Sequence, residues 1–234
     1  MKPLTRLRYL EAMGIDVWVQ RAPVLAASNT VAADTECLVS TELAAPPSDL
    51  AAQWATLAQE VKNCQACGLC QSRTQTVFGV GAKTADWLLI GEAPGQSEDQ
   101  MGEPFVGKAG QLLNEMLLAM GLQRDSVYIA NMLKCRPPNN RDPQVDEIAA
   151  CSGFLQRQIA LIQPKIILAV GRIAAQNLLQ QTLPLSKLRG QVYQIQNIPL
   201  TIVHHPSYLL RSPLEKRKAW EDLQFAVAHY RLLT

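Results

Sequence analysis

The chain has 234 residues, of which 48% are hydrophobic and 18% charged, and its formal net charge is only +2. These values are typical of one globular domain with a sizeable core, and they exclude a disordered or strongly basic protein. The sequence shows no apolar run of the roughly 20 residues that a membrane span needs and no secretory leader pattern, so we expect a soluble, cytoplasmic protein with no membrane partner.

The first 47 residues differ in composition from the rest of the chain. Residues 1–21 carry a small apolar pattern that is compatible with one short helix, and residues 22–47 are rich in Ala, Ser, Thr and Pro, which indicates a flexible linker. The first segment is either a docking peptide for a protein partner or a poorly ordered leader. We therefore expect an N-terminal extension, residues 1–47, followed by one domain, residues 48–234.

The remainder alternates predicted helices and buried strands. Apolar residues at helical spacing predict a first helix from Ser48 or Asp49 to Cys64. Further helices are expected near residues 112–120, 144–162, 171–179 and 213–233, strands over residues 87–90, 127–130, 165–170 and 199–203, and a short strand and turn within residues 73–81. This alternation predicts an α/β sandwich with a parallel sheet.

Residues 88–110, LLIGEAPGQSEDQMGEPFVGKAG, form the candidate ligand site. A buried strand ends in a glycine- and proline-rich turn, a polar loop follows, and a helix begins after Gly107. Open α/β sheets bind ligands where such strands end. Neither residues 79–84 nor Gly107-Lys108 has the spacing of a phosphate-binding loop, so a nucleoside-triphosphate site is not supported.

Six cysteines in a chain without a leader favour metal or redox chemistry over disulfides. Zinc ribbons usually present two close pairs of ligands, whereas an iron–sulfur cube accepts thiolates from separated segments. Spacing alone therefore favours a cluster but leaves zinc and free thiols open. Cys70 is interpreted as a small buried residue and Cys37 as having no role. The four remaining cysteines form one close and one open pair: Cys64, Cys67, Cys135 and Cys151.

Several motifs follow one another in the order C-x-x-C, GEAPG, EDxxGxPFVGxAG, YIxNxxKCRPP, a further cysteine and HPxxLLR. In this order they resemble the family 4 uracil-DNA glycosylases over roughly residues 52–232. The resemblance implies a three-layer α/β/α sandwich with a mostly parallel central sheet. It also implies a monomeric, nucleoid-associated repair enzyme that flips uracil out of DNA and hydrolyses its N-glycosidic bond. The implied cofactor is a [4Fe–4S] cluster on Cys64, Cys67, Cys135 and Cys151.

The resemblance further implies a uracil pocket whose residue types suit the chemistry. Phe105 offers a face for stacking, and the Asn131 amide can donate to O4 and accept from N3–H, which cytosine would not satisfy. His205 can stabilise the charge that grows on O2 as the bond breaks, while His204 is expected to be structural. The implied pocket residues are Glu92, Ala93, Glu98, Phe105, Asn131 and His205.

Water activation is the open step of this mechanism. Related glycosylases carry an aspartate where this chain has Ala93. Glu92 is the first candidate for positioning water and Glu98 the second, although either carboxylate could instead order the loop. Two alternatives therefore stay open: a non-catalytic iron–sulfur DNA-binding protein on the same fold, and a glycosylase for another deaminated base. A zinc-containing α/β hydrolase lacks support, because no Gly-x-Ser-x-Gly elbow is present.

Basic residues beside the site motifs are candidates for contact with DNA phosphates. Leu209 or Leu210 could insert into the gap left by a flipped base, with Arg211 holding a phosphate, although either leucine could belong to the core. The basic candidates are Lys108, Lys134, Arg136, Arg141, Lys187, Arg189, Arg211, Lys216, Arg217 and Lys218.

Overall fold

A six-stranded sheet forms the centre of the computed structural model, which describes residues 47–234. The strand order is β1-β3-β2-β4-β6-β5; the inner four strands are parallel, and β1 and β5 pair antiparallel at the edges. The predicted, mostly parallel sheet is thus confirmed. The strands are β1 (Val80–Gly81), β2 (Trp87–Gly91), β3 (Tyr128–Asn131), β4 (Ile166–Val170), β5 (Tyr193–Ile195) and β6 (Ile198–Val203).

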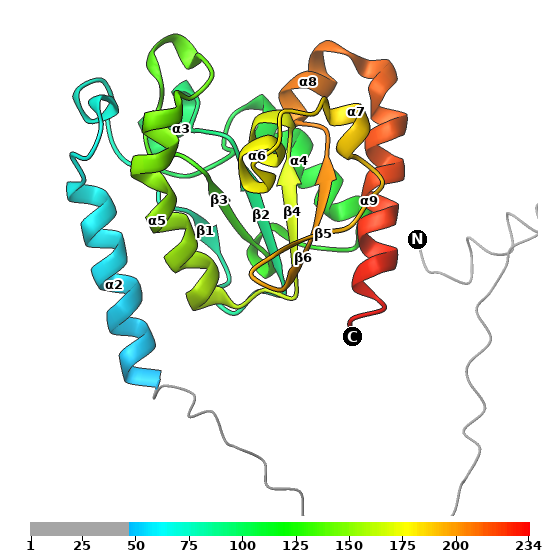
Figure 1. The fold of residues 1–234 in the computed structure, drawn as a ribbon, viewed down its shortest axis with the longest axis horizontal. Coiled ribbons are helices and arrows are strands. Elements are labelled where there is room, and N and C mark those ends of the chain that lie inside the picture. The colour runs from blue at the N-terminus through cyan, green and yellow to red at the C-terminus, as the bar shows by residue number, and fades with distance from the viewer. Residues whose placement is uncertain (1–46) are drawn as a thin grey trace, which may run out of the picture. The chain divides into compact units, whose positions relative to one another are not determined.

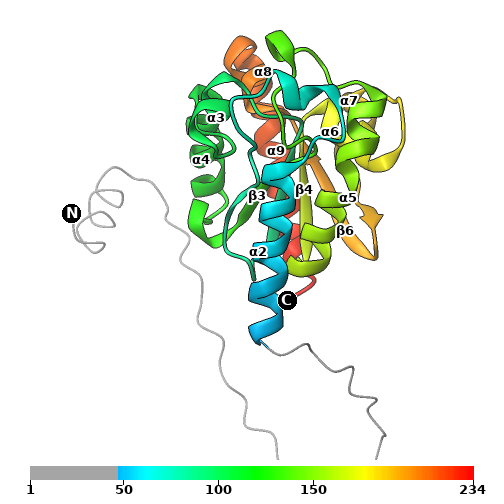
Figure 2. The same cartoon turned by 90° about the vertical axis from the view of Figure 1, so that its left-hand side faces the viewer.

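Helices cover both faces of this sheet, as Figures 1 and 2 show. The α-helices are α2 (Pro47–Asn63), α3 (Gln96–Met101), α4 (Lys108–Ala119), α5 (Val145–Ile162), α6 (Arg172–Leu179), α7 (Leu185–Leu188), α8 (Pro206–Arg211) and α9 (Lys216–Tyr230). Four 3-10 turns connect them: η1 (Gly68–Gln71), η2 (Arg124–Ser126), η3 (Pro138–Asn140) and η4 (Pro213–Glu215). No helix within residues 47–234 combines the length and the apolar character needed to cross a membrane.

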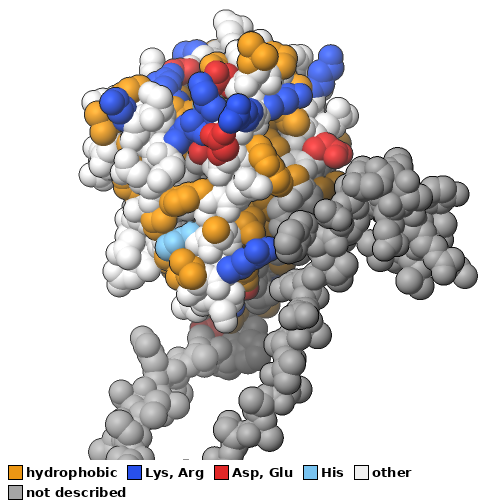
Figure 3. Space-filling model, turned by 90° about the vertical axis from the view of Figure 1, so that its right-hand side faces the viewer, with side chains coloured by type: hydrophobic (Ala, Val, Ile, Leu, Met, Phe, Trp, Pro, Cys, Tyr) orange, Lys and Arg blue, Asp and Glu red, His pale blue; other side chains and the backbone are white. Residues whose placement is uncertain are grey.

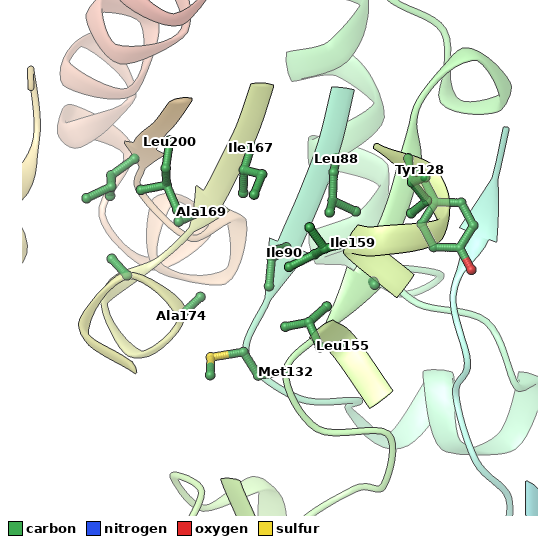
Figure 4. Close-up of a cluster of buried hydrophobic side chains, with 14 of the residues drawn as sticks. Leu88, Ile90, Tyr128, Met132, Leu155, Ile159, Ile167, Ala169, Ala174 and Leu200 are labelled. Atoms are coloured by element: carbon green, nitrogen blue, oxygen red, sulfur yellow. The ribbon is translucent and has the colours of Figure 1, made fainter. Parts of the chain in front are cut away.

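Alternating side chains of the inner strands build two hydrophobic cores. Leu88 and Ile90 of β2 point toward α5, where Figure 4 shows them beside Leu155 and Ile159. Leu89 points to the other face, into the core made with α4 and α9. Every residue of β2 is buried, because both faces of a parallel sheet are covered by helices. The three-layer α/β/α sandwich is therefore confirmed.

The long predicted elements are present with ends shifted by only a few residues, but the short ones differ. The loop after β2 contains α3, the expected strand within residues 73–81 shrinks to β1, and β5, α7 and α8 were not predicted. The last helix begins at Lys216 rather than at Pro213, because Pro213–Glu215 form the separate 3-10 turn η4. Predictions for the extension concern residues that lie outside the described part, apart from Pro47.

Candidate active site

A cavity of about 700 Å³ opens at the carboxyl ends of the parallel strands. This is the upper end of Figure 1, toward which the arrows of β4 and β6 point and where α8 lies. Parallel strands bring the residues that follow them to one edge of the sheet, so segments far apart in sequence meet there. The structure brings all six predicted pocket residues to this cavity: Glu92, Ala93, Glu98, Phe105, Asn131 and His205.

Asn131, the last residue of β3, lies at the bottom of the cavity with 2% of its surface exposed. Its Oδ1 is buried and has no hydrogen-bond partner among the described residues. A Cβ added at Gly91 would lie 2.4 Å from this oxygen and 2.7 Å from the Phe105 ring, so only glycine fits there. A buried acceptor left unpaired costs about 1–3 kcal/mol, so this oxygen is available to accept a hydrogen bond from a ligand in the cavity.

Phe105 lines the same cavity in a strained backbone conformation. Its φ is +53°, a left-handed value that is rare for a bulky side chain and that surrounding contacts must enforce. The helix α4 packs so closely that a Cβ at Gly110 would lie 1.8 Å from the Phe105 carbonyl oxygen. Arg124 of η2 donates from Nη2 to the Pro104 carbonyl at 2.5 Å. These contacts fix the ring in the cavity wall.

Glu98 holds the other side of the Phe105 loop. Its Oε1 accepts the backbone N–H groups of Val106 and Gly107 at 2.9 and 3.0 Å, and its Oε2 accepts the N–H group of Gly95 at 3.1 Å. Both carboxylate oxygens are therefore engaged within the loop. This geometry favours the loop-ordering role of Glu98 over direct contact with a base or water.

His205 begins α8 and faces the Phe105 ring, with the ring centroids 5.7 Å apart. Its Nδ1 accepts the Ser207 backbone N–H at 3.2 Å, so the proton of the neutral ring resides on Nε2. Burial lowers the pKa of His205 to about 4, and the charge of Arg211 acts in the same direction. The cavity thus contains a neutral imidazole that can donate one hydrogen bond.

His204 is buried, also lines the cavity, and has different neighbours from His205. Its Nδ1 lies 3.5 Å from Asp222 Oδ2, and its ring stacks on Tyr208 with centroids 5.6 Å apart. These contacts hold the turn between β6 and α8, in agreement with the structural role expected for His204.

Glu92 is half-buried at the end of β2 and carries a perturbed carboxyl group. Burial, with a smaller contribution from the charge of nearby Asp142, raises the pKa of Glu92 to about 7, and Arg172 opposes the shift. Arg172 and Asp142 form an ion pair at 3.1 Å that joins the start of α6 to the loop before α5. Glu92 can therefore gain or lose a proton near neutral pH.

The basic residues expected to face DNA separate into free and engaged side chains. Arg211 lines the cavity and has no ion-pair partner within residues 47–234, and Lys108 is exposed at the start of α4. Arg189 is bound to Asp222 at 2.7 Å, and Arg141 to Glu147. Figure 3 shows Lys and Arg side chains, with acidic ones among them, gathered in the upper part of the face that carries α9.

Two predicted DNA contacts are wrong. Lys134 is 1% exposed, because its side chain points into the interior beside α5 rather than toward solvent. Leu209 is 1% exposed, because it belongs to the core beneath α8. Leu210, on the other side of α8, is 44% exposed and stays available for insertion.

The predicted metal ligands lie together around a second, smaller cavity between α2, η1 and α5. Three donors point at their sulfurs: Arg73 Nη1 to Cys135 at 3.0 Å, the Lys134 backbone N–H to Cys151 at 3.3 Å, and the Ala66 backbone N–H to Cys64 at 3.5 Å. Cys70 also lines this cavity and is half-buried, so it is not the buried core residue that was expected. Cys37 lies outside the described residues. Lining cysteines are Cys64, Cys67, Cys70, Cys135 and Cys151.

Within residues 47–234, no three His, Cys, Asp or Glu side chains converge closely enough to hold a single metal ion. The four proposed ligands nevertheless line one small cavity.

Some functional contacts escaped the sequence analysis. Arg124 and Arg172 reach the site from segments that carry no recognisable motif. Asp142 did lie beside the KCRPP motif, but its influence on Glu92 depends on the fold alone.

Comparison with known proteins gives a consistent result. The family model described as the uracil DNA glycosylase superfamily matches residues 78–224. A type-4 uracil-DNA glycosylase of Archaeoglobus fulgidus is 43% identical over 174 residues, which cover 71% of this chain and 87% of that protein. Its counterpart in Sulfurisphaera tokodaii is 42% identical, covering 71% of this chain and 80% of that protein. The one in Thermotoga maritima is 41% identical, covering 73% and 91%.

Proposed function

The chain belongs to the uracil DNA glycosylase superfamily and, within it, to the type-4 uracil-DNA glycosylases, and from this premise we propose how it removes uracil from DNA. It is a DNA-repair hydrolase of N-glycosidic bonds. The observation that carries the assignment of its pocket is the buried, unpaired Oδ1 of Asn131 beside the Phe105 ring.

Uracil is selected by its hydrogen-bonding edge. A base inside a duplex is inaccessible, so the nucleotide is flipped into the cavity and stacks on Phe105. Asn131 then accepts the uracil N3–H with Oδ1 and donates to O4 with Nδ2. Cytosine carries no proton on N3 and has an amino group at the position of O4, so it would leave both groups of Asn131 unsatisfied.

His205 acts on the leaving group. Negative charge grows on uracil O2 as the glycosidic bond breaks, and a donor aimed at that atom stabilises the transition state more than the ground state. The Ser207 N–H group occupies Nδ1, which leaves the Nε2–H of His205 to donate to O2. Because its pKa is lowered to about 4, His205 is a neutral donor at physiological pH.

Glu92 positions the water that attacks the sugar. It lies at the rigid end of β2 and lines the cavity, whereas Glu98 has both oxygens engaged in its loop. The neighbouring Ala93 provides no carboxylate. With a pKa of about 7, Glu92 is charged in part of the molecules at neutral pH and can then accept a proton from water.

Contact with DNA comes from the rim of the cavity. Arg211 and Lys108 hold phosphates, and Leu210 occupies the gap that the flipped base leaves in the stack. Their exposure supports these roles, as does the absence of an ion-pair partner for Arg211 in the described part of the chain.

A [4Fe–4S] cluster on Cys64, Cys67, Cys135 and Cys151 is the second part of the proposal. A cube takes one thiolate at each of four iron corners and accepts ligands from separated segments, and these four cysteines line one cavity. Arg73 and a backbone N–H group already donate to two of these sulfurs, and such bonds stabilise the thiolate form. When bound, the cluster would join the segment between α2 and η1 covalently to the segments around residues 135 and 151.

A release assay tests the activity. The purified protein should liberate uracil from single- and double-stranded DNA, leave an abasic site, need no added divalent metal and leave hypoxanthine in place. Asn131→Asp should lose at least about tenfold in rate, because a carboxylate cannot donate to O4. An unchanged rate for this variant would remove Asn131 from the pocket, and hypoxanthine release at a similar rate would change the substrate.

Metal analysis tests the cofactor. Anaerobically purified protein should be brown and contain about four irons per chain. Serine substitution at any of the four proposed ligands should remove the colour, whereas Cys70→Ser, in the same cavity, should retain it. Stoichiometric zinc without iron would overturn the cluster.

A further inference from the structure

Lys134 is a lysine in a place where lysines are rare. It lies three residues after Asn131, is 1% exposed, and among residues 47–234 no carboxylate is within ion-pair distance of its Nζ. Burying an ammonium group is costly unless its protons are well used. The uracil-excising mechanism described above gives it no task.

The Lys134 ammonium group holds the backbone at the bottom of the pocket. Its Nζ donates to the Asn131 carbonyl oxygen at 2.9 Å and to Gln158 Oε1 at 2.7 Å. Gln158 is fully buried on α5, and its Nε2 donates in turn to the Phe78 carbonyl oxygen at 2.9 Å. The end of β3 is thereby attached to α5 and to the segment before β1.

The Lys134 main chain is bound at the same time to the cysteine site. Its N–H group donates to Cys151 Sγ at 3.3 Å, and the next residue is Cys135. Cys151 and Gln158 are seven residues apart on α5 and so lie on one face of the helix. Lys134 therefore contacts two successive parts of that face, one with its backbone and one with its side chain.

The five residues from Asn131 to Cys135 have little freedom between these two ends. The N–H groups of Met132 and Leu133 donate to the carbonyl oxygens of Gly91 and Glu92 at 3.0 and 3.1 Å. The Lys134 carbonyl oxygen accepts the Val77 N–H at 2.8 Å. These bonds fix the segment against the end of β2, the loop that carries Glu92 and the segment before β1.

We propose, on the basis of the uracil-excising function above, that Lys134 is a positioning residue that holds Asn131 in the geometry for uracil and joins the base pocket to the cysteine site. It acts through the Asn131 backbone without touching the base.

Free-uracil binding by Lys134→Met tests this role, because the apparent dissociation constant of a mostly folded protein stays close to that of its folded state. Methionine matches the volume of lysine and needs no hydrogen bond. We expect uracil binding to weaken at least about fivefold and single-turnover release to slow at least about tenfold, since small displacements of positioning groups cost up to about 10²-fold. Binding of abasic-site DNA and iron per folded chain should stay within about twofold of the parent. Lys165→Met, at a surface lysine bound to Asp86, is the matched control. It should leave both uracil binding and uracil release unchanged.

A double-mutant cycle with Asn131→Ala distinguishes positioning from general stabilisation. If Lys134 acts through Asn131, then Lys134→Met should weaken uracil binding little further once Asn131 has been removed. Independent, additive losses, or a Lys134→Met variant that binds uracil like the parent, would overturn the proposal. Should Lys134→Met fail to fold, Gln158→Leu removes one of the two hydrogen bonds that hold the Lys134 ammonium group. This variant must then also weaken uracil binding. If the parent neither binds uracil nor releases it from DNA, the proposed function itself is refuted. This outcome is distinct from those that overturn only the role of Lys134.

Discussion

His205 depends for its chemistry on one hydrogen bond within its own turn. The Ser207 N–H group occupies Nδ1 and so selects the ring form that donates from Nε2. His205→Ala should slow single-turnover uracil release on the order of a hundredfold or more while DNA binding stays nearly intact, because the lost interaction strengthens in the transition state. His204→Ala is the control and should cost stability more than rate. Equal rates for His205→Ala and the parent would leave the Glu92 loop to carry the reaction.

Glu92 shows the cost of burying a functional carboxyl group. Its pKa in the folded protein is raised to about 7 from 4.5, so the folded state binds a proton more tightly than the unfolded state. Stability from this group is present at low pH and is lost as pH rises toward about 7. The melting-temperature advantage of Glu92→Gln over the parent should therefore grow between about pH 5 and about pH 8.

The rate of uracil release should depend on pH in the opposite direction to stability. If charged Glu92 positions water, uracil release by the parent rises with pH through about 7, and Glu92→Gln is slower and lacks that rise. A pH–rate profile of single turnovers measures this. The same profile in Glu92→Gln and the parent would show that Glu92 only orders the loop.

Individual residues were predictable where a motif carries them and not where the fold alone places them. Asn131 ends a strand and His205 follows one, both within recognisable motifs, and the structure places both in the cavity. Lys134 stands in such a motif as well, but a charged residue beside Cys135 gives no sign in sequence that it is buried. Arg124, far from any motif, reaches the loop of Phe105 only after folding.

Helices and strands were predictable from the sequence where an apolar pattern runs along the element, and not where a few individual hydrogen bonds determine it. The inner strands β2 and β4 are buried along their whole length, and α5 buries one apolar face, so their positions were expected closely. Short α3 depends on tertiary bonds, since Asp99 accepts the Thr74 backbone N–H at 2.9 Å, and α8 begins at the cap formed by His205. Neither bond has a sequence pattern.

Two adjacent leucines of α8 lie in different environments, one exposed and one buried. Leu210 is exposed at the rim, so Leu210→Ala should slow uracil release from double-stranded DNA more than from single-stranded DNA, where no stack has to be filled. Leu209 is in the core, so Leu209→Ala should cost about 2–5 kcal/mol of stability and leave this ratio unchanged. Comparing the two rates in each variant measures the ratio. A change confined to Leu209→Ala would contradict the assignment.

At the scale of the whole molecule, the two cavities share one end of the sheet and one segment of chain. Residues 131–135 connect the base pocket to the cysteine site, and α5 contacts that segment through Cys151 and Gln158. The sequence could indicate each site by its motifs. It could not indicate their linkage, because the linkage consists of contacts between a strand end and a helix that sequence spacing does not specify.

The part of the chain that performs this chemistry should begin at α2. The motifs, the four proposed ligands and the whole sheet lie after Pro47, and the matches to the relatives cover about seven-tenths of the chain. Trp54, Leu57 and Val61 of α2 are buried against the domain, so a chain that starts at residue 47 keeps its core, whereas one that starts at residue 64 loses it. We expect the first truncation to retain iron content and uracil release near the parental values and the second to fold poorly. Loss of iron or activity in the first truncation would mean that residues 1–46 contribute to the domain, contrary to the linker predicted from their composition.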